Sequence, residues 1–471
     1  MNQQKGEIIV SNSATQRPNV IWIFGDQHRA QALGYAGDPN VHTPNIDRLA
    51  EEGLTLTAAV GGCPLCSPYR GALLSGRYPH NSGVPEHQGL LPADQPTIAD
   101  AFKGAGYRTS YFGKWHVGGF QEGVGSRAGL YVVPPEHRGH FDDWIGYENN
   151  NSQWDCWVHG GVSGGVSGGG RTEADDAFQY RLPGYETDAL TDLFVDYIDQ
   201  RGQEQVDEEG DPFFAVLSVQ PPHDPYVAPE EWMCRHNAAE LTLRPNVPDI
   251  PRVVEQARRE LAGYYAMIEN LDWNVGRIRS ALDKAGLAHN THIIFFSDHG
   301  DMHGSHGQFR KTNPFEESIR VPCIIGGHVP RYENRDGHLP VPINHVDIGP
   351  TSLGLCGIDA PEWMEGTDYS GLRVPGREVG ELPDSAFLQL VVPTSHGDST
   401  DRPWRGVVTI DGWKYVALEG QPWMMYNLNE DPYEFANLAH NTRYGEERRR
   451  LQKRLAAWIS ETGDAFVLPS L

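Results

Sequence analysis

Cys66 stands in a segment whose residue types favour the binding of an anion. Residues 63–77 read CPLCSPYRGALLSGR, so Pro68 and Arg70 follow the cysteine two and four positions later. Pro68 suits the first turn of a helix and Gly76 suits its end, so we expect Cys66 just ahead of a helix N-terminus. The unpaired N–H groups of that terminus and the guanidinium of Arg70 both attract anions. The segment therefore predicts a site for a sulfate or phosphate group.

The same cysteine also has a structural interpretation. Cys63 and Cys66 form a CxxC pair, which elsewhere marks a redox pair or half of a zinc site. The sequence has no second CxxC, and the other four cysteines are scattered at positions 156, 234, 323 and 356. A lone cysteine is usually buried and inert. The motif alone leaves both interpretations open, so the rest of the chain must decide.

Polar residues with catalytic chemistry follow four short apolar runs elsewhere in the chain. The runs are residues 20–24 before Asp26 and Gln27, 109–112 before Lys114 and His116, 213–219 before His223, and 293–296 before Asp298 and His299. Continuous apolar runs of this length are typical of strands buried on both faces of a parallel sheet. Helical patterns lie between them, at residues 43–52 and 254–285. We therefore predict an α/β fold with a large doubly wound, mostly parallel sheet flanked by helices, and ligands bind at the carboxyl ends of such strands.

The pattern changes after about residue 376, which predicts a second unit. Short strands at 404–409, 413–418 and 424–428 and a helix at about 445–462 indicate a C-terminal α+β subdomain with a small antiparallel sheet. We expect an N-terminal tail at 1–17, a catalytic α/β domain at 18–375 and this subdomain at 376–471. The glycine-rich stretch at 159–170 is either a linker or a loop over the substrate pocket.

The composition indicates a globular protein and argues against polyanionic partners. The chain has 471 residues, 39% of them hydrophobic, and a mean hydropathy of −0.50. A formal charge of −25 disfavours nucleic acid and anionic membranes, so an anion site must be local, built from a metal ion and a few cationic side chains. No signal-peptide core or membrane-spanning run is visible. We expect a soluble, cytoplasmic protein, and six cysteines in so long a chain fit a reducing compartment.

Several motifs in chain order resemble those of one enzyme family. They are DQ at 26–27 with TPNIDRLA at 43–50, GKWHVG at 113–118, PHDPY at 222–226, SDHGD at 297–301, Lys311 before FEESIRVP at 315–322, and YNLNEDPYEFANL at 426–438. With the CxPxR pattern at Cys66, they resemble the type I, formylglycine-dependent sulfatases of the alkaline phosphatase superfamily. Each motif is weak alone, but the set spans residues 18 to about 440 and is specific.

The resemblance implies a cofactor and a modified nucleophile. In that family a formylglycine-generating enzyme oxidises the cysteine that corresponds to Cys66, and the aldehyde hydrate attacks sulfur. By the same resemblance, Asp26, Gln27, Asp298 and His299 would hold one divalent cation together with an oxygen of the modified Cys66. Oxygen ligands favour Ca²⁺, and the single histidine admits Mn²⁺ or Mg²⁺ as alternatives.

The resemblance also assigns roles to the remaining cationic residues around a small sulfated substrate. Arg70 and Lys114 would stabilise the hydrated aldehyde and the sulfate charge. His223 and Lys311 would lie by the leaving oxygen, one of them as general acid, and Lys114 would join both in binding the substrate. His116 would be the base that helps to release sulfate.

Two departures from the family pattern leave rival hypotheses open. Gln27 replaces a usual acidic residue and Tyr69 replaces a serine. One hypothesis is a sulfatase for a sulfated carbohydrate or similar small ester, and the second is a phosphonate monoester or phosphodiester hydrolase with the same machinery. The third is a non-catalytic metal-binding homologue that never acquires the aldehyde. As an alternative to metal binding, Asp298 and His299 could be a capping pair at a helix start. Tryptophans at 154, 157, 404 and 423 could stack on sugars or fill the core.

Overall fold

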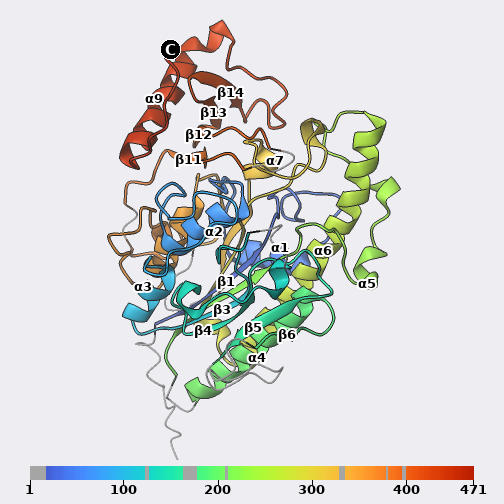
Figure 1. The fold of residues 1–471 in the computed structure, drawn as a ribbon, viewed down its shortest axis with the longest axis vertical. Helices are drawn as coiled ribbons and strands as arrows, with labels where there is room; N and C mark the ends of the chain where they lie inside the picture. Colours follow the sequence, from blue (N-terminus) through green and yellow to red (C-terminus); the bar gives the residue numbers. More distant parts are fainter. Residues whose placement is uncertain are drawn as a thin grey trace, which may run out of the picture.

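The computed structural model describes residues 17–121, 127–162, 178–206, 210–327, 335–377, 380–394 and 399–470. Within these ranges the chain forms a large α/β layer structure and, at one end, a small antiparallel sheet with a helix (Figure 1). The predicted fold class is therefore confirmed. Most of the glycine-rich stretch, from residue 163, lies outside the described residues, as do residues 1–16 of the predicted tail. Among the described residues, no helix is both long and apolar enough to cross a membrane.

One large sheet forms the centre of the α/β part. Its ten strands in the described residues follow the order β10-β2-β9-β8-β1-β7-β3-β4-β5-β6. The strands are β1 (Asn19–Gly25), β2 (Leu54–Leu56), β3 (Arg108–Lys114), β4 (Asp143–Tyr147), β5 (Trp157–Gly161), β6 (Tyr180–Arg181), β7 (Phe213–Val219), β8 (Thr291–Ser297), β9 (Cys323–Gly326) and β10 (Gly337–Leu339). The middle strands β8, β1, β7, β3 and β4 are parallel, whereas β9 and β5 join them in antiparallel fashion.

Helices cover both faces of this sheet, which explains why its central strands are continuous apolar runs. Helices α1 (Pro44–Glu52), α4 (Glu186–Val206) and α6 (Pro251–Lys284) pack against one face, where Ile21 and Ile23 of β1 point. Helices α2 (Cys66–Ser75), α3 (Ile98–Gly104) and α8 (Ile348–Leu355) cover the other face with Trp22 and Phe24. Every residue of β1 is buried.

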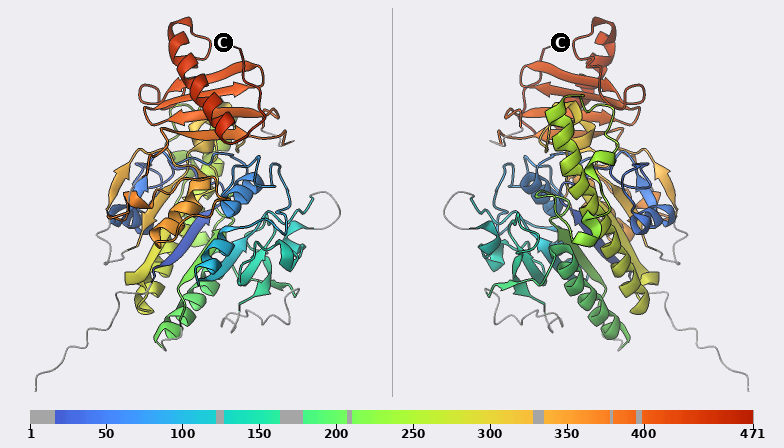
Figure 2. Two further views of the ribbon diagram at one scale, coloured as in Figure 1. Left: turned by 90° about the vertical axis from the view of Figure 1, so that its left-hand side faces the viewer. Right: turned by 90° about the vertical axis from the view of Figure 1, so that its right-hand side faces the viewer.

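The C-terminal unit is a four-stranded antiparallel sheet with one long helix. Its strands run in order β11 (Ser385–Leu390), β12 (Trp404–Thr409), β13 (Trp413–Leu418) and β14 (Gln421–Asn427). Helix α9 (Gly445–Glu461) lies across it, and the unit stacks on one end of the α/β part (Figure 2). Strands β12 and β13 match the predicted ranges, whereas β11 was not predicted. The short helices α5 (Glu230–Met233) and α7 (Glu316–Ile319) complete the described α-helices. The domain boundary at 375/376 stays a prediction.

Candidate active site

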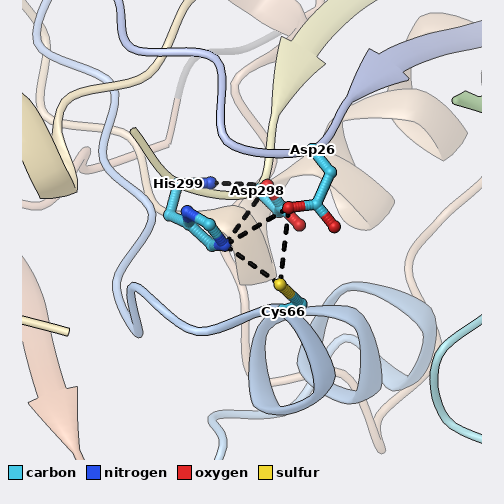
Figure 3. A group of neighbouring side chains, drawn as sticks. All are labelled: Asp26, Cys66, Asp298 and His299. Carbon is cyan, nitrogen blue, oxygen red and sulfur yellow. Dashed lines mark hydrogen bonds and ion pairs between the residues drawn. The ribbon is translucent and has the colours of Figure 1, made fainter. Parts of the chain in front are cut away.

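The site lies where the carboxyl ends of neighbouring parallel strands meet the N-terminus of α2. Asp26 follows β1, and Asp298 and His299 follow β8, the hydrogen-bonded neighbour of β1. Cys66 is the first residue of α2. Figure 3 shows these four side chains converging on one point. Segments far apart in the sequence thus come together here, and Cys66 and His299 alone are 233 positions apart.

Cys66 is buried among charged and polar groups. Cys66 is only 1% exposed. Its Sγ lies 3.4 Å from Asp26 Oδ1 and 3.2 Å from His299 Nε2. The Nζ of Lys311 donates a hydrogen bond to the same sulfur at 3.2 Å. Burial, and then Asp26, raise the pKa of the Cys66 thiol to about 12. The unmodified thiol is therefore protonated at neutral pH and is a weak nucleophile there.

Cys63, the other half of the CxxC pair, has a different environment. Both cysteines are free thiols, so they do not form a disulfide. Cys63 is fully buried in an apolar cluster with Val60, Leu65 and Met302. The redox and zinc interpretations of the pair find no support in these surroundings, because only Cys66 belongs to a group that could bind a metal.

The carboxylates of Asp26 and Asp298, the Nε2 of His299 and the Sγ of Cys66 form a candidate metal site. These ligand atoms all lie within 4.8 Å of one another. Asp298 Oδ1 accepts hydrogen bonds from the backbone N–H groups of Gln27 and His299, both at 2.9 Å, whereas Asp298 Oδ2 receives none. Burial and the charge of Asp26 raise the pKa of Asp298 to about 7. Asp298 Oδ2 faces Arg70 at 3.6 Å, and two crowded, buried carboxylates of this kind fit a hard divalent cation.

His299 is held in the tautomer that a metal ligand needs. Its Nδ1 donates a hydrogen bond to the carbonyl of Gly300 at 3.0 Å, so its Nε2 presents a lone pair toward Cys66. Burial and the nearby Lys311 hold the pKa of His299 well below its usual value. The imidazole is therefore neutral and able to bind a metal at neutral pH.

Three cationic side chains surround these carboxylates. Lys114 Nζ donates a hydrogen bond to Asp26 Oδ2 at 2.6 Å, and Arg70 approaches the same oxygen at 3.4 Å. Burial would raise the pKa of Asp26, but Lys114 and Lys311 outweigh it and hold that pKa well below its usual value. With Lys311, three cations face the two carboxylates. The site therefore concentrates positive charge inside a chain of net charge −25, as the sequence required of an anion site.

Gln27 lies next to this group, and hydrogen bonds occupy both ends of its amide. Its Oε1 accepts a hydrogen bond from Lys311 Nζ at 2.8 Å. Its Nε2 donates to Asp301 Oδ2 at 2.5 Å and to Tyr226 at 3.2 Å. The carbonyl oxygen points to the cationic side of the site, and its role as a metal ligand stays a prediction.

The two predicted catalytic histidines are both neutral. Burial and the charge of Lys311 lower the pKa of His223 to about 4, and its Nδ1 lies 2.7 Å from the carbonyl oxygen of Asp224. Burial and Lys114 hold the pKa of His116 well below its usual value. Neither ring nitrogen of His116 has a hydrogen-bond partner in the described residues. His116 is therefore a buried base with both nitrogens available to a ligand.

Other contacts in and around the site were not predicted. The Ser218 hydroxyl accepts a hydrogen bond from Arg70 at 2.9 Å, and Tyr69 stacks on His345 with ring centroids 4.5 Å apart. Both depend on tertiary packing that no local pattern reveals. Trp404 is fully buried, which excludes it from contact with a sugar.

Asp347 lies at the junction of the short 3-10 helix His345–Asp347 and α8. It precedes α8, but its side chain makes no cap hydrogen bond to that helix. Its carboxylate instead accepts hydrogen bonds from the backbone N–H of Asn344 at 2.7 Å and of Thr367 at 2.8 Å. The bond from Asn344 is half of the capping box of the 3-10 helix His345–Asp347, and the bond from Thr367 ties a second segment to that helix.

Comparison with known proteins identifies the class to which this fold and site belong. The sulfatase family model matches residues 18–358, and the model of the N-sulphoglucosamine sulphohydrolase C-terminal region matches residues 304–461. The chain is 32% identical over 481 residues to the ulvan-active sulfatase of Formosa agariphila, with 98% of this chain and 85% of that protein covered. It is also 32% identical over 485 residues to the endo-4-O-sulfatase of Bacteroides thetaiotaomicron, covering 90% of this chain and 88% of that protein.

Solved structures share the whole fold. The crystal structure of yidJ from Bacteroides fragilis superposes with a TM-score of 0.82 at 27% identity and covers 99% of this chain and 98% of its own. A phosphonate monoester hydrolase of Agrobacterium radiobacter superposes with a TM-score of 0.72 at 22% identity, covering 95% and 96% of the two chains, which shows a shared fold alone. The chain belongs to the sulfatase family, and the protein is a sulfatase, a sulfuric ester hydrolase.

Proposed function

We propose that this sulfatase hydrolyses a sulfate monoester on a carbohydrate, with formylglycine formed from Cys66 as its nucleophile and one divalent cation as its cofactor. The observation that carries the proposal is the position of Cys66. Its sulfur contacts Asp26, His299 and Lys311 at the carboxyl ends of β1 and β8, where a nucleophile would meet a metal and a proton donor.

The donor set fits the cation that we propose. Asp26, Asp298 and His299 would hold it together with an oxygen of the modified Cys66, and Gln27 would contribute its carbonyl oxygen. Two carboxylates and further oxygen ligands favour Ca²⁺, with Mn²⁺ or Mg²⁺ as alternatives because of the imidazole. When bound, the cation would acidify the nucleophile and draw charge from a sulfate oxygen.

The modification supplies the chemistry that the thiol lacks. An aldehyde formed from Cys66 supplies, as its hydrate, an oxygen nucleophile, and we propose that a formylglycine-generating enzyme installs it. Arg70 and Lys114 would hold the negative charge of the sulfate oxygens, since both cations already face Asp26 within 3.4 Å. Their burial makes the interaction with a sulfate stronger than it would be in water.

Protonation states separate the roles of the remaining residues. Burial would lower the pKa of Lys311, but Cys66 and Asp26 outweigh it and raise that pKa above its usual value, so Lys311 carries its proton at neutral pH. His223 does not, because its pKa is about 4. We therefore propose that Lys311 protonates the leaving oxygen while His223 orients the substrate. His116, with both ring nitrogens available, would take the proton whose loss releases sulfate.

The names of the relatives support a carbohydrate substrate. Both relatives at 32% identity are named for sulfatase activity, one on ulvan and one as an endo-4-O-sulfatase. Trp154 is 44% exposed, which leaves an aromatic face available for a sugar. A saccharide sulfate is therefore the substrate class that we would test first.

One observation favours a second candidate, a phosphonate monoester or phosphodiester hydrolase. Gln27 leaves the metal site with one carboxylate fewer than the usual family pattern, and a DQ opening at 26–27 with a DH closing at 298–299 also resembles phosphonate monoester and phosphodiester hydrolases. The third hypothesis, a non-catalytic metal-binding homologue, is tested by the same measurement. That measurement compares sulfate esters with a phosphonate ester, and the sulfate and phosphonate model substrates share the para-nitrophenol leaving group.

The test uses protein co-expressed with a formylglycine-generating enzyme and a Cys66→Ala variant as the matched control. Sulfate release from sulfated saccharides and from para-nitrophenyl sulfate is compared with hydrolysis of para-nitrophenyl phenylphosphonate. We expect kcat/KM for the best sulfate ester to exceed that for the phosphonate by about 100-fold or more. Faster phosphonate cleavage would support the second candidate. Modified protein that cleaves neither ester class would contradict the proposed activity.

A further inference from the structure

The backbone around Lys311 is held in an unusual conformation. Arg310 has a φ of 68° and Thr312 a φ of 78°, so Lys311 lies between two non-glycine residues in the left-handed region. Such a conformation is strained for a non-glycine residue and persists only where the surroundings hold it. This turn directs Lys311 Nζ to Gln27 Oε1 at 2.8 Å and to Cys66 Sγ at 3.2 Å. The contacts that hold the turn therefore decide where the ammonium group lies.

The α/β domain holds the first half of the turn. The backbone N–H of Arg310 donates a hydrogen bond to Asp301 Oδ1 at 3.0 Å, and the N–H of Met302 donates to the carbonyl of Arg310 at 2.8 Å. After Lys311, the N–H of Thr312 donates to the carbonyl of Pro64 at 3.2 Å, which ties the turn to the segment that leads into Cys66. These bonds leave the carbonyl groups of residues 312 and 314 to other partners.

The C-terminal sheet supplies those partners. Trp404 on β12 donates its indole N–H to the carbonyl of Thr312 at 3.1 Å. Lys414 on β13 donates from its Nζ to the carbonyl of Pro314 at 2.7 Å and to Glu316 Oε1 at 3.1 Å. Both side chains are fully buried. Two adjacent strands of the C-terminal unit thus hold the segment that follows Lys311.

Lys414 is itself fixed by buried acidic groups. It forms ion pairs with Glu316 and Glu434, and Glu434 Oε2 accepts a hydrogen bond from the backbone N–H of Glu316 at 2.8 Å. The surrounding cluster pairs three acidic side chains with three basic ones: Glu316, Glu317 and Glu434 with Lys414, Arg244 and Arg320. The cluster is therefore an ion-paired contact between the C-terminal unit and the α/β part. Removing one member leaves an unpaired charge in the interior.

We propose that Lys414 and Trp404 are positioning residues for Lys311, so that the C-terminal subdomain keeps the ammonium group of Lys311 on the reacting centre. The inference rests on the proposed function for the catalytic role of Lys311. It goes beyond that function because neither residue reaches the reacting atoms through any described contact. Both act through the backbone of residues 312–316.

A double-mutant cycle on the modified enzyme tests this positioning role. With para-nitrophenyl sulfate as substrate, we expect Lys414→Met to lower kcat by about tenfold and to change KM by less than about threefold. In a Lys311→Ala background, we expect the same substitution to lower kcat by less than about twofold, because the group that it positions is gone. Trp404→Phe, which removes the N–H and keeps an aromatic ring, carries the same test if Lys414→Met does not fold.

Arg405→Met is the matched control. Arg405 is buried on the same strand as Trp404, and its polar partners are Asp464 and the carbonyls of Leu390 and Trp404 rather than the turn. We expect Arg405→Met to change kcat by less than about twofold at equal folded fraction.

Limited trypsin digestion gives a readout that does not depend on activity. Lys311 is only 3% exposed in the native protein, and a released turn would expose the bonds after Arg310 and Lys311. We expect cleavage there to be about tenfold faster in Lys414→Met than in wild type or Arg405→Met.

Three results would overturn the positioning role. The first is a wild-type kcat in the folded Lys414→Met or Trp404→Phe variant. The second is that Lys414→Met lowers kcat as much in the Lys311→Ala background as in the wild type. The third is that Arg405→Met lowers kcat as much as Lys414→Met does. A fully active Lys311→Ala enzyme would be a different failure, because it would refute the proposed role of Lys311 itself. The two failures are therefore distinguishable.

Discussion

Asp26 is the residue whose loss should reveal most about the forces in the site. Its carboxylate pairs with Lys114 at 2.6 Å and with Arg70 at 3.4 Å, and all three side chains are buried. At an effective dielectric constant of about 20, unit charges 2.6 Å apart attract by about 6 kcal/mol before desolvation is counted. Removing one member of a buried pair costs about 3–5 kcal/mol, so we expect that loss for Asp26→Asn. The substitution keeps the shape of the side chain and removes only its charge.

The assay is urea unfolding followed by tryptophan fluorescence, with a chelator present so that metal binding does not contribute. Arg48 and Glu52 on α1 provide a matched control, because their ion pair has the same 2.6 Å distance but is exposed. We expect no measurable change in the urea midpoint for Arg48→Gln. The pKa of Asp26 is lowered in the folded state, so its contribution is present above the unfolded pKa of about 3.9. It is lost as the pH falls through the lower folded-state pKa.

A double variant distinguishes the ion pair from other effects of the substitution. In Asp26→Asn with Lys114→Met, no ammonium group is left beside the missing charge, so we expect at least about half of the lost stability to return. Activity should not return, because both residues serve the reaction. The reasoning is refuted if Asp26→Asn costs no more than Arg48→Gln, or if the two substitutions destabilise the protein additively.

The remaining predictions concern the cysteines and the metal. Cys66→Ala should lower kcat by about 1,000-fold or more, whereas Cys63→Ala, in the apolar core, should leave kcat within about twofold. Comparable losses of kcat in both variants would contradict the assignment of Cys66 as the source of the nucleophile. In protein expressed without the maturation enzyme, iodoacetamide should label the exposed Cys234 and spare Cys66. The Cys66 thiol is buried, and burial and Asp26 raise its pKa to about 12. In urea, which exposes all six cysteines, Cys66 should be labelled as well. Peptide mapping measures both sites, and rapid native labelling of Cys66 would be the contrary result. A chelator should abolish turnover and Ca²⁺ should restore it, and undiminished turnover after verified metal removal would exclude the cation.

The central sheet and the candidate metal site could be predicted because their signals are local. β1, β7 and β8 are apolar runs buried on both faces, and polar residues follow each run where a parallel sheet places its ligands. β12 and β13 were predictable from turn residues at Asp411 and Gly412. β11 was missed because residues 385–390 read SAFLQL, which neither alternates strictly nor forms a continuous apolar run.

Features that depend on tertiary packing could not be predicted. The bond from Arg70 to Ser218 joins residues 148 positions apart, and the ammonium group of Lys414 meets the carbonyl of Pro314 across 100 positions. Nothing in a local pattern distinguishes Lys414 from a solvated lysine, yet it is fully buried. Trp404 was open to a sugar-stacking interpretation for the same reason. Charge pairing in the interior therefore has to be found in the structure.

The central claim is that Cys66 acts as formylglycine and not as a thiol. The most direct measurement is the mass of the peptide that contains Cys66, taken from active protein, together with the specific activity of the same sample. Conversion of the thiol to the aldehyde removes about 18 Da, and we predict that activity rises in proportion to the converted fraction across preparations. Full activity in protein whose Cys66 peptide keeps the unmodified mass would contradict the account.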